Sequence, residues 1–433
     1  MEHLRLYPRY QHLTRKEVAS PRIVTGSAAS LARLLRRSSR ALGNRIWLLA
    51  DDNTATAAPE LVEALGCGER ASILPGTPTV IPDVALAERI AAEAADAGSR
   101  TIVVIGGGTL TDLAKYAAHV ADLELLSVPS AASVDAYTSA RSALRIAGYH
   151  RTPEARVPTV ILACPAIIEA APESLTLAGL GDLVAKVIAR FDWQLGAIAT
   201  GEDFSLREAE WSARVARHAL ARLRRAGLRA ASFPALDALL VTGGTMLVFG
   251  SSRPSASSEH TMAHLWEVAL DDTGADRYHG LLVARAAVYV IAAYRWILGR
   301  LRTGTPPGPS PHDAGRHWEE RLPPDMQPFL DKMREETGTW TVDATVVAER
   351  RSRIASRRAL IVEMAERAIS DAERGLHALQ MAGIGAYLPD IPDHWVARSI
   401  QWVRYLRNRY SMFNLAFEMG WEPELLDHLD ASR

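Results

Sequence analysis

Short β-rich runs alternate with helical patterns through the first third of this chain, and this alternation restricts the fold more than any other feature. Residues 45–50, 100–105 and 123–128 predict strands, and helical stretches separate them. Residues 100–105 are largely apolar, as expected of a strand covered on both faces. Strands separated by helices predict a parallel sheet of βαβ units. We therefore expect an α/β domain over residues 1–165.

The pattern changes near residue 166, where long amphipathic stretches replace the β-rich runs. No convincing strand follows residues 160–162. Periodicity of this kind predicts helices. The predicted helices cover residues 173–196, 204–226, 234–249, 259–270, 280–301, 344–384 and 393–418. We expect an all-α C-terminal domain over residues 166–433, with a surface loop near residues 303–313, where glycine and proline are concentrated.

Composition excludes several classes of function. The chain has 49 Lys and Arg against 50 Asp and Glu, which gives no reason to expect a nucleic acid or an anionic membrane as a partner. Its two cysteines, Cys67 and Cys164, form no disulfide framework and fit a reducing cytoplasm. The N-terminal residues lack the apolar core of a signal peptide. Apolar stretches such as residues 286–298 fall short of a membrane span. We predict a soluble cytoplasmic protein.

A glycine-rich turn ends the strand predicted over residues 100–105. Gly107 and Gly108 let a backbone approach a pyrophosphate, and the helix that begins near Thr109 presents free N–H groups to an anion. Asp112 follows in the same helix. The turn is not the GxGxxG fingerprint, so a tight β–α turn capped by Thr109 is the alternative. The position after a buried strand favours a dinucleotide cofactor.

Two further loops follow predicted strands. Asp51 comes after the first strand, where a carboxylate accepts bonds from an adenosine ribose and mildly favours NAD over NADP. Its alternative role is a helix N-cap. Ser130, Ser133 and Ser139 follow residues 123–128 and offer hydroxyls to a cofactor, whereas Asp135 would face a nicotinamide or a substrate hydroxyl. Serine-rich loops are also common without any ligand.

One aspartate and three histidines indicate a metal site. Asp182 lies in a mostly apolar helical stretch, where a carboxylate is costly unless it is paired or binds a cation. His260 and His264 share one face of a predicted helix, so both bind metal or one contacts substrate. His279 precedes Gly280 after a loop. Such a set forms an open site for Zn²⁺, Fe²⁺ or Ni²⁺. Structural histidines are the alternative.

The segments that carry these residues resemble sn-glycerol-1-phosphate dehydrogenases, a branch of the superfamily of iron-type alcohol dehydrogenases, glycerol dehydrogenases and dehydroquinate synthases. The matching segments are residues 50–54, 106–112, 129–135, 171–182, 192–193, 250–260, 264–267 and 407–416. Dehydroquinate synthases have a glutamate at the position of Asp182, so the aspartate favours the dehydrogenases. Ala136, where the family usually has glycine, and the serine-rich segment 255–258 depart from the family pattern beside the expected substrate site.

The resemblance implies a dehydroquinate synthase-like fold, with a Rossmann-like parallel-sheet domain, an all-α domain and the active site in the cleft between them. It also implies roles for the individual residues. Asp51, Gly107, Gly108, Thr109, Asp112, Ser130, Ser133 and Ser139 would contact NAD or NADP; Asp182, His260 and His279 would hold one divalent metal; Asp135, Asp182 and His264 would meet the substrate. Relatives of this kind form dimers or larger homo-oligomers.

We hypothesise a reversible reduction of dihydroxyacetone phosphate to sn-glycerol 1-phosphate by NAD(P)H, with Asp182 and His264 as catalytic residues. The metal would polarise the carbonyl, and His264 or a water would relay the proton. Candidate partners of the substrate phosphate are Arg141, Arg145, Arg253 and Lys186. The alternatives are a dehydrogenase of the same fold acting on another small polyol, hydroxyaldehyde or phosphonate-like substrate, and a lyase of the dehydroquinate synthase type.

Overall fold

A mainly parallel sheet forms the base of the α/β lobe, which we define as residues 5–6 and 20–163. The structure, a computed structural model, describes residues 5–6, 20–43, 45–77, 79–147, 149–270, 278–309, 318–336 and 343–431. Every pair of neighbouring strands in this sheet is parallel except the first. The seven strands lie in the order β1 (Arg5–Leu6), β2 (Arg22–Thr25), β9 (Val160–Ala163), β6 (Glu124–Pro129), β5 (Thr101–Gly106), β3 (Ile46–Asp51) and β4 (Ala71–Leu74). The predicted parallel sheet is confirmed.

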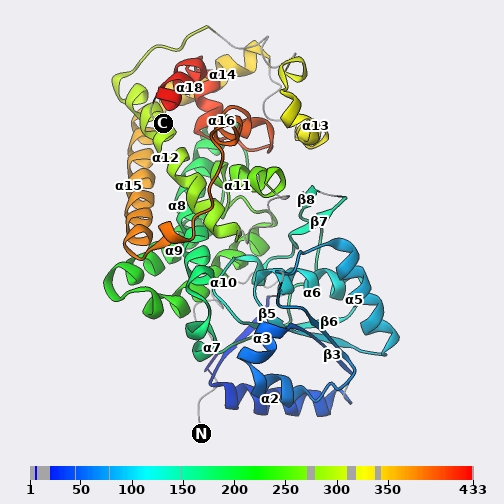
Figure 1. Ribbon diagram of the computed structural model, residues 1–433. Helices are drawn as coiled ribbons and strands as arrows, with labels where there is room; N and C mark the ends of the chain where they lie inside the picture. The colour runs from blue at the N-terminus through cyan, green and yellow to red at the C-terminus, as the bar shows by residue number, and fades with distance from the viewer. Residues whose placement is uncertain are drawn as a thin grey trace.

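Helices cover both faces of this sheet, which explains why its central strands are apolar at successive positions (Figure 1). Ile46 and Leu48 of β3 pack into one core cluster, whereas Trp47 and Leu49 pack into the cluster on the opposite face. The helices of this lobe are α2 (Ala28–Ala41), α3 (Asp52–Ala57), α4 (Pro59–Leu65), α5 (Val84–Asp96) and α6 (Gly108–Val120). Helices α2 and α4 contribute to the first cluster, and α5 and α6 contribute to the second.

The ends of β3, β5 and β6 place three predicted cofactor segments at one edge of the sheet. Strands β5 and β6 pair in register with Gly106 opposite Pro129. Because the strands are parallel, Asp51, Gly107 and Ser130 follow carboxyl ends that meet at the same edge. A two-stranded hairpin, β7 (Leu144–Ile146) and β8 (Tyr149–Arg151), follows the short 3₁₀ helix η1 (Ala136–Thr138) in the chain.

Beyond β9, every described element is helical, and these elements form the helical lobe, residues 165–431. Two of the predicted helices are divided: 344–384 breaks at Arg357, and 393–418 breaks between Trp402 and Met412. The α-helices are α7 (Pro165–Ala170), α8 (Glu173–Thr200), α9 (Leu206–Ala226), α10 (Leu228–Phe249), α11 (Ser258–Ala269), α12 (His279–Thr303), α13 (Leu330–Glu335), α14 (Ala344–Ser356), α15 (Arg358–Met381), α16 (Asp393–Trp402), α17 (Met412–Glu418) and α18 (Glu422–Ala431). The 3₁₀ helices are η3 (Glu319–Arg321), η4 (Pro324–Phe329), η6 (Ile384–Ala386) and η7 (Val403–Tyr405).

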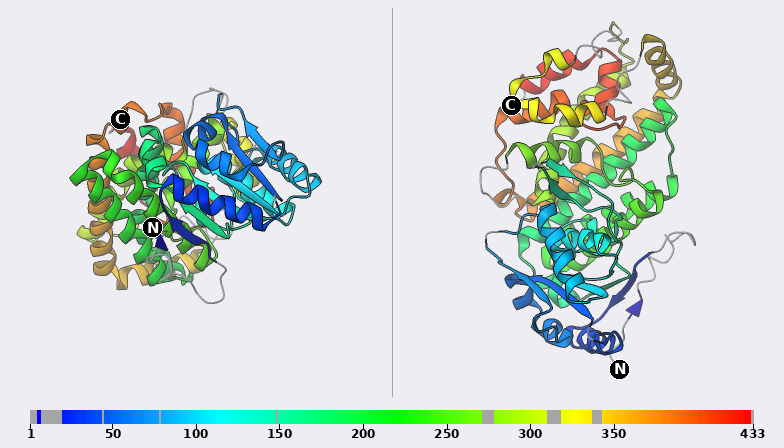
Figure 2. Two further views of the ribbon diagram at one scale, coloured as in Figure 1. Left: turned by 90° about the horizontal axis from the view of Figure 1, so that it is seen from below. Right: turned by 90° about the vertical axis from the view of Figure 1, so that its right-hand side faces the viewer.

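The two lobes lie at opposite ends of the molecule in Figure 1 and in the right-hand view of Figure 2. The predicted boundary after residue 165 falls at the first residue of α7, two residues beyond the end of β9, and it stays a prediction. Part of the predicted loop, residues 310–313, and the N-terminal residues used to argue against a signal peptide, apart from 5–6, lie outside the described residues.

Two helices of the second lobe are long and apolar enough to cross a membrane, namely α10 and α12. The prediction that all apolar stretches fall short of a membrane span was therefore wrong when length and composition alone are considered. Within the fold, 67% of the residues in each apolar window are buried. Both helices contribute to the core of the helical lobe, where Leu239 of α10 and Val283 of α12 are fully buried. Packing against neighbouring helices accounts for their apolar character.

Candidate active site

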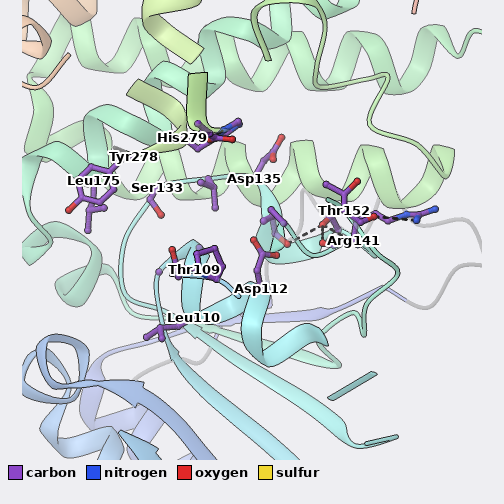
Figure 3. Close-up of a pocket in the computed structure, with 18 of the residues that line it drawn as sticks. Thr109, Leu110, Asp112, Ser133, Asp135, Arg141, Thr152, Leu175, Tyr278 and His279 are labelled. Atoms are coloured by element: carbon purple, nitrogen blue, oxygen red, sulfur yellow. Dashed lines mark hydrogen bonds and ion pairs between the residues drawn. The ribbon is translucent and has the colours of Figure 1, made fainter. Parts of the chain in front are cut away.

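One large cavity is lined by most of the predicted site residues. Its volume is about 1400 Å³, and residues of both lobes line it. Twelve of the thirteen predicted site residues line this cavity: Asp51, Gly107, Gly108, Thr109, Asp112, Ser130, Ser133, Asp135, Ser139, His260, His264 and His279. Figure 3 shows Thr109 and Asp112 on one side, His279 on the other, and Ser133 and Asp135 between them. The exception, Asp182, is completely buried behind the wall.

The glycine-rich turn presents a helix N-terminus without a capping side chain. Gly107 is the N-cap of α6, so the alternative in which Thr109 caps the helix was wrong. A Cβ on Gly106 would lie 2.6 Å from Leu110, and a Cβ on Gly108 would lie 2.5 Å from Val134, so both glycines are needed for packing. Gly107 meets only the Ser133 hydroxyl, at 3.8 Å. The first amides of α6 are therefore available to an anion in the cavity.

Lys115, which the sequence did not single out, holds the loop that faces this turn. Its buried Nζ donates to Asp112 Oδ1 at 3.2 Å, to Ser139 Oγ at 3.0 Å and to the Ala136 carbonyl at 2.8 Å. Burial raises the pKa of Asp112 to about 6, although the Lys115 ammonium opposes this shift. Asp112 and Ser139, predicted as cofactor contacts, thus also anchor the loop that carries Asp135. The sequence holds one signal for this anchoring role: Asp112 and Lys115 are one helical turn apart and can therefore contact each other.

Close backbone contacts bring Asp182 and His279 together. A Cβ on Gly280 would lie 1.8 Å from the Ala178 carbonyl oxygen, and a Cβ on Gly181 would lie 2.4 Å from the Gly280 carbonyl oxygen. Only glycines allow α8 and the start of α12 to approach this closely. Because Asp182 follows Gly181 and His279 precedes Gly280, this contact places a carboxylate beside an imidazole.

Asp182, His260 and His279 form a cluster whose ligand atoms all lie within 4.8 Å of one another. Asp182 Oδ1 is 3.0 Å from His260 Nε2, while Asp182 Oδ2 is buried without a hydrogen-bond partner. Burial alone would raise the pKa of Asp182, but Lys186 and His260 outweigh burial and hold it well below its usual range. A permanently ionised, buried carboxylate with an unsatisfied oxygen beside two imidazoles has the donor set of a divalent-metal site.

Glu267 orients two of the three histidines. Its Oε1 is 2.6 Å from His279 Nδ1, and its Oε2 is 2.8 Å from His264 Nδ1. Glu259 Oε1 plays the same part for His260 Nδ1, at 3.1 Å. Metal-binding histidines usually place such a partner on the second ring nitrogen. His264, Glu267 and His279 also lie close enough to be ligands. However, these atoms already bond one another, so we interpret Glu267 as the orienting group.

Lys186 connects the metal-site candidate to the predicted substrate residue. Its fully buried Nζ lies 2.9 Å from Asp182 Oδ1 and 2.7 Å from Asp135 Oδ2. Burial alone would lower the pKa of Lys186, but the two carboxylates outweigh it and raise the pKa. The ammonium therefore stays charged and neutralises both aspartates. This position does not suit Lys186 as the predicted phosphate partner.

The other predicted phosphate partners separate into two groups. Arg141 and Arg145 line the cavity from the α/β lobe. Arg253 does not line it, because its Nε donates to Glu202 Oε2 at 2.9 Å and its Nη2 donates to the Tyr410 carbonyl at 2.9 Å. Arg253 is thus part of an internal ion pair, a position that does not suit it as the predicted phosphate partner.

Comparisons of the sequence and of the fold with known proteins show the structural class of this protein. A sequence model of the family described as iron-containing alcohol dehydrogenase matches residues 22–172. The structure is similar to a probable glycerol dehydrogenase from Sinorhizobium meliloti, with a TM-score of 0.58 at 16% identity over 96% of this chain and 100% of that one. An iron-containing alcohol dehydrogenase from Thermococcus thioreducens gives 0.59 at 16% identity over 96% and 99% of the two chains. The molecule has the fold of the iron-containing alcohol dehydrogenases.

Proteins with similar sequences identify one family within this structural class. The chain is 34% identical over 255 residues to a glycerol-1-phosphate dehydrogenase from Methanothrix thermoacetophila, covering 56% of this chain and 70% of the relative. It is 34% identical over 212 residues to the corresponding enzyme from Sulfolobus acidocaldarius, covering 48% of this chain and 58% of the relative. The chain belongs to the glycerol-1-phosphate dehydrogenase family. The matched segment spans little more than half of the Sulfolobus relative's length.

Proposed function

We propose that this protein is a metal-dependent oxidoreductase that interconverts dihydroxyacetone phosphate and sn-glycerol 1-phosphate with NAD(P)H. The observation that carries the proposal is one cavity that joins the uncapped α6 N-terminus to His260 and His279, with buried Asp182 behind them. The names of the relatives supply the substrate: each is a glycerol-1-phosphate dehydrogenase for NAD(P)+.

Asp182, His260 and His279 would hold one divalent metal, Zn²⁺, Ni²⁺ or Fe²⁺. The unsatisfied Asp182 Oδ2 and the carboxylate-bonded Nδ1 atoms of both histidines support this assignment. Such a metal acts as a Lewis acid toward a carbonyl oxygen. Burial alone would lower the pKa of His279, but Glu267 outweighs it and raises the pKa to about 9. Metal binding at neutral pH would therefore displace a proton from this ring.

The chain's own residues would orient the substrate and move a proton. Lys186 fixes Asp135 at 2.7 Å, so the Asp135 carboxylate can accept a hydrogen bond from a substrate hydroxyl at the cavity wall. The Glu267 carboxylate favours a proton on Nδ1 of His264, so Nε2 is the atom that would exchange a proton with the substrate oxygen. The completely buried Lys186 ammonium lies between Asp182 and Asp135 and contacts both carboxylates.

The cofactor would span the edge of the sheet, with its pyrophosphate at the α6 N-terminus and its adenosine near Asp51. Asp51 Oδ1 accepts a hydrogen bond from the Thr54 amide at 2.7 Å, so the carboxylate caps α3 while it lines the cavity. Both roles considered from the sequence fit together here. The negative charge supports NAD over NADP, whose 2′-phosphate it would repel.

The test is NADH oxidation by purified protein loaded in turn with Zn²⁺, Ni²⁺ and Fe²⁺, with dihydroxyacetone phosphate and with unphosphorylated dihydroxyacetone. We expect metal-dependent reduction of the phosphorylated substrate, which Asp182→Asn and His260→Ala abolish. His377→Ala removes an exposed histidine of α15 and serves as the control, with unchanged rates. Full activity of both site variants would contradict the metal assignment.

The same assay separates the alternatives. A preference for the unphosphorylated ketone would favour a dehydrogenase for another polyol, and turnover without net NADH oxidation would favour a lyase. A homo-oligomer, a cytoplasmic location and a small phosphorylated triose or polyol as the substrate remain proposals. Size-exclusion chromatography with light scattering decides the first.

A further inference from the structure

Two arginines that the proposed reaction does not use line the helical-lobe wall of the cavity. Arg407 and Arg409 lie between η7 and α17, and both contribute to the cavity surface. The segment 250–256, which leads into α11 and its His260, forms the adjoining wall with Ser251, Ser252 and Ser255. The wall beside the metal-site candidate thus combines guanidinium groups with hydroxyls.

The Arg409 guanidinium bonds only neutral atoms. Its Nη1 donates to the Ala256 carbonyl oxygen at 2.8 Å, and its Nη2 donates to the Ser252 hydroxyl. Within the described part of the chain, no carboxylate lies within ion-pair distance of it. Burial, together with repulsion from Arg407 and Arg253, lowers its pKa to about 9, and the more distant carboxylates of Glu336 and Glu259 oppose this shift only in part. A guanidinium has five N–H donors, so the two bonds to Ala256 and Ser252 leave several for an anion.

The surrounding charges leave an excess of positive charge at this place. Glu336 Oε1 lies 3.6 Å from Arg407 Nη1 but only 2.6 Å from Lys332 Nζ, so one carboxylate is shared by two cations. Arg253, the third arginine nearby, is already neutralised by Glu202. Glu336 and Glu259 attract Arg409 only from beyond ion-pair distance, and both already bond other groups, so positive charge is in excess here and a dianion would balance it.

The segment that carries these arginines is held rigidly on its far side. The Asn408 amide donates to Glu336 Oε2 at 2.7 Å, and the Tyr410 carbonyl accepts from Arg253 Nη2 at 2.9 Å. The Met412 amide donates to Asp192 Oδ1 at 3.3 Å. Three backbone groups pinned by buried or partly buried side chains limit the movement of the segment. Preorganised cations lose less entropy when an anion binds.

We propose that Arg409, with Ser252 and Arg407 beside it, forms the subsite for the phosphate monoester of the substrate. This inference rests on the proposed function and adds the recognition of the phosphate. In the proposed function, the cofactor's pyrophosphate would lie at the Gly107 turn on the opposite lobe, and its adenosine end would lie near Asp51. The arginines instead adjoin the loop that leads into the helix of His260, where the substrate must lie.

The experiment compares wild-type protein with Arg409→Gln and Arg409→Lys, all loaded with metal. The first readout is the ratio of kcat/KM for dihydroxyacetone phosphate to kcat/KM for dihydroxyacetone. We expect Arg409→Gln to lower this ratio about 100-fold, with Arg409→Lys in between, because lysine keeps the charge but loses the planar fork. Arg302→Gln removes an exposed arginine that pairs with Glu366, and it should leave the ratio unchanged.

The second readout is binding of inorganic phosphate to the metal- and NADH-loaded protein by calorimetry, which requires no turnover. We expect binding by the wild type that weakens at least tenfold in Arg409→Gln. If the wild type fails to reduce dihydroxyacetone phosphate but still binds phosphate through Arg409, the proposed substrate is wrong and the anion subsite stands.

The opposite results overturn the subsite. If the wild type reduces dihydroxyacetone phosphate and Arg409→Gln leaves both the ratio and phosphate binding unchanged, the function stands without it. Equal losses on both ketones with unchanged phosphate binding would show that Arg409 only positions the wall. A selective loss in Arg141→Gln but not in Arg409→Gln would place the phosphate on the α/β lobe instead. Melting temperatures close to the wild-type value establish that each variant is folded.

Discussion

The backbone contact at Gly280 predicts opposite effects for two Gly-to-Ala substitutions in α12. A Cβ at position 280 would lie 1.8 Å from the Ala178 carbonyl oxygen, so an ordinary contact of 3.4 Å requires a shift of about 1.6 Å between α8 and α12. The obstacle is backbone, which no side-chain rotation relieves. Gly299 lies in the same helix, and a Cβ there would meet nothing within 4 Å. The pair therefore separates crowding from helix propensity.

We expect Gly280→Ala to lower the free energy of unfolding by roughly 2–3 kcal/mol, the upper part of the usual range for overpacking, because the obstacle is backbone. Gly299→Ala should raise it by about 0.5–1 kcal/mol, because alanine loses less backbone entropy in a helix. Metal affinity provides the sharper measurement. Metal–ligand distances tolerate about 0.2 Å, so a shift of this size between the Asp182 and His279 backbones should weaken metal binding at least tenfold.

Urea denaturation of metal-free protein gives the stabilities, and competition with a chromophoric chelator gives the metal affinities. Gly299→Ala should bind metal as the wild type does. If Gly280→Ala binds metal with wild-type affinity and unfolds at the wild-type urea concentration, the two helices do not depend on this contact, and the explanation of how Asp182 meets His279 fails.

Three further predictions concern single carboxylates. Glu267→Gln should weaken metal binding about 10- to 100-fold while the fold is retained, measured by the same chelator competition; unchanged affinity would refute an orienting role. Asp51→Asn keeps an oxygen for the Thr54 amide but removes the charge, and it should raise the kcat/KM ratio of NADPH to NADH about tenfold. Burial raises the pKa of Asp192 to about 7, although Ser257 and Tyr294 oppose it, so stability should fall as pH rises from about 4 through 7. That slope in the unfolding free energy should flatten in Asp192→Asn, and an equal slope would contradict the assignment.

The sign of the Asp192 effect follows from proton binding. Because the folded-state pKa lies above the unfolded value, the folded protein binds more protons between these two values, and the stabilisation is complete only below about pH 4. Glu259 raises this pKa further and Arg253 lowers it, so both must be kept in the comparison.

Elements with strong local patterns could be predicted from the sequence. Strand β5 has six buried residues in succession, and its apolar run identified it. Strands β2 and β4 have four residues each, and each exposes one of them, so their patterns are too short to stand out. The break at Arg357 also escaped detection, because apolar periodicity continues across it from α14 into α15.

The site divides in the same way, between residues with a distinctive local setting and residues whose role depends on tertiary contacts. A carboxylate in an apolar helix and two histidines one turn apart are unusual in sequence, and these features singled out Asp182, His260 and His264. Glu267 is one turn beyond His264, which was a usable signal, but its bond to His279 crosses to another helix. Arg409 has no local pattern at all: its significance arises from its place at the cavity wall, where its side chain donates hydrogen bonds to two neutral atoms.

Two glycines connect the local sequence pattern of the site with its tertiary contacts. Gly181 precedes Asp182 and Gly280 follows His279, so each glycine is adjacent to a predicted ligand. The structure shows that each removes a Cβ that would collide with a backbone carbonyl of the neighbouring segment. The Gly-Asp pair in α8 and the His-Gly pair at the start of α12 therefore act together. The glycines set the distance between the two helices, and this distance brings the Asp182 carboxylate close to the His279 ring. Metal ligands on separate segments need such a spacing control, because errors of a few tenths of an ångström already weaken coordination.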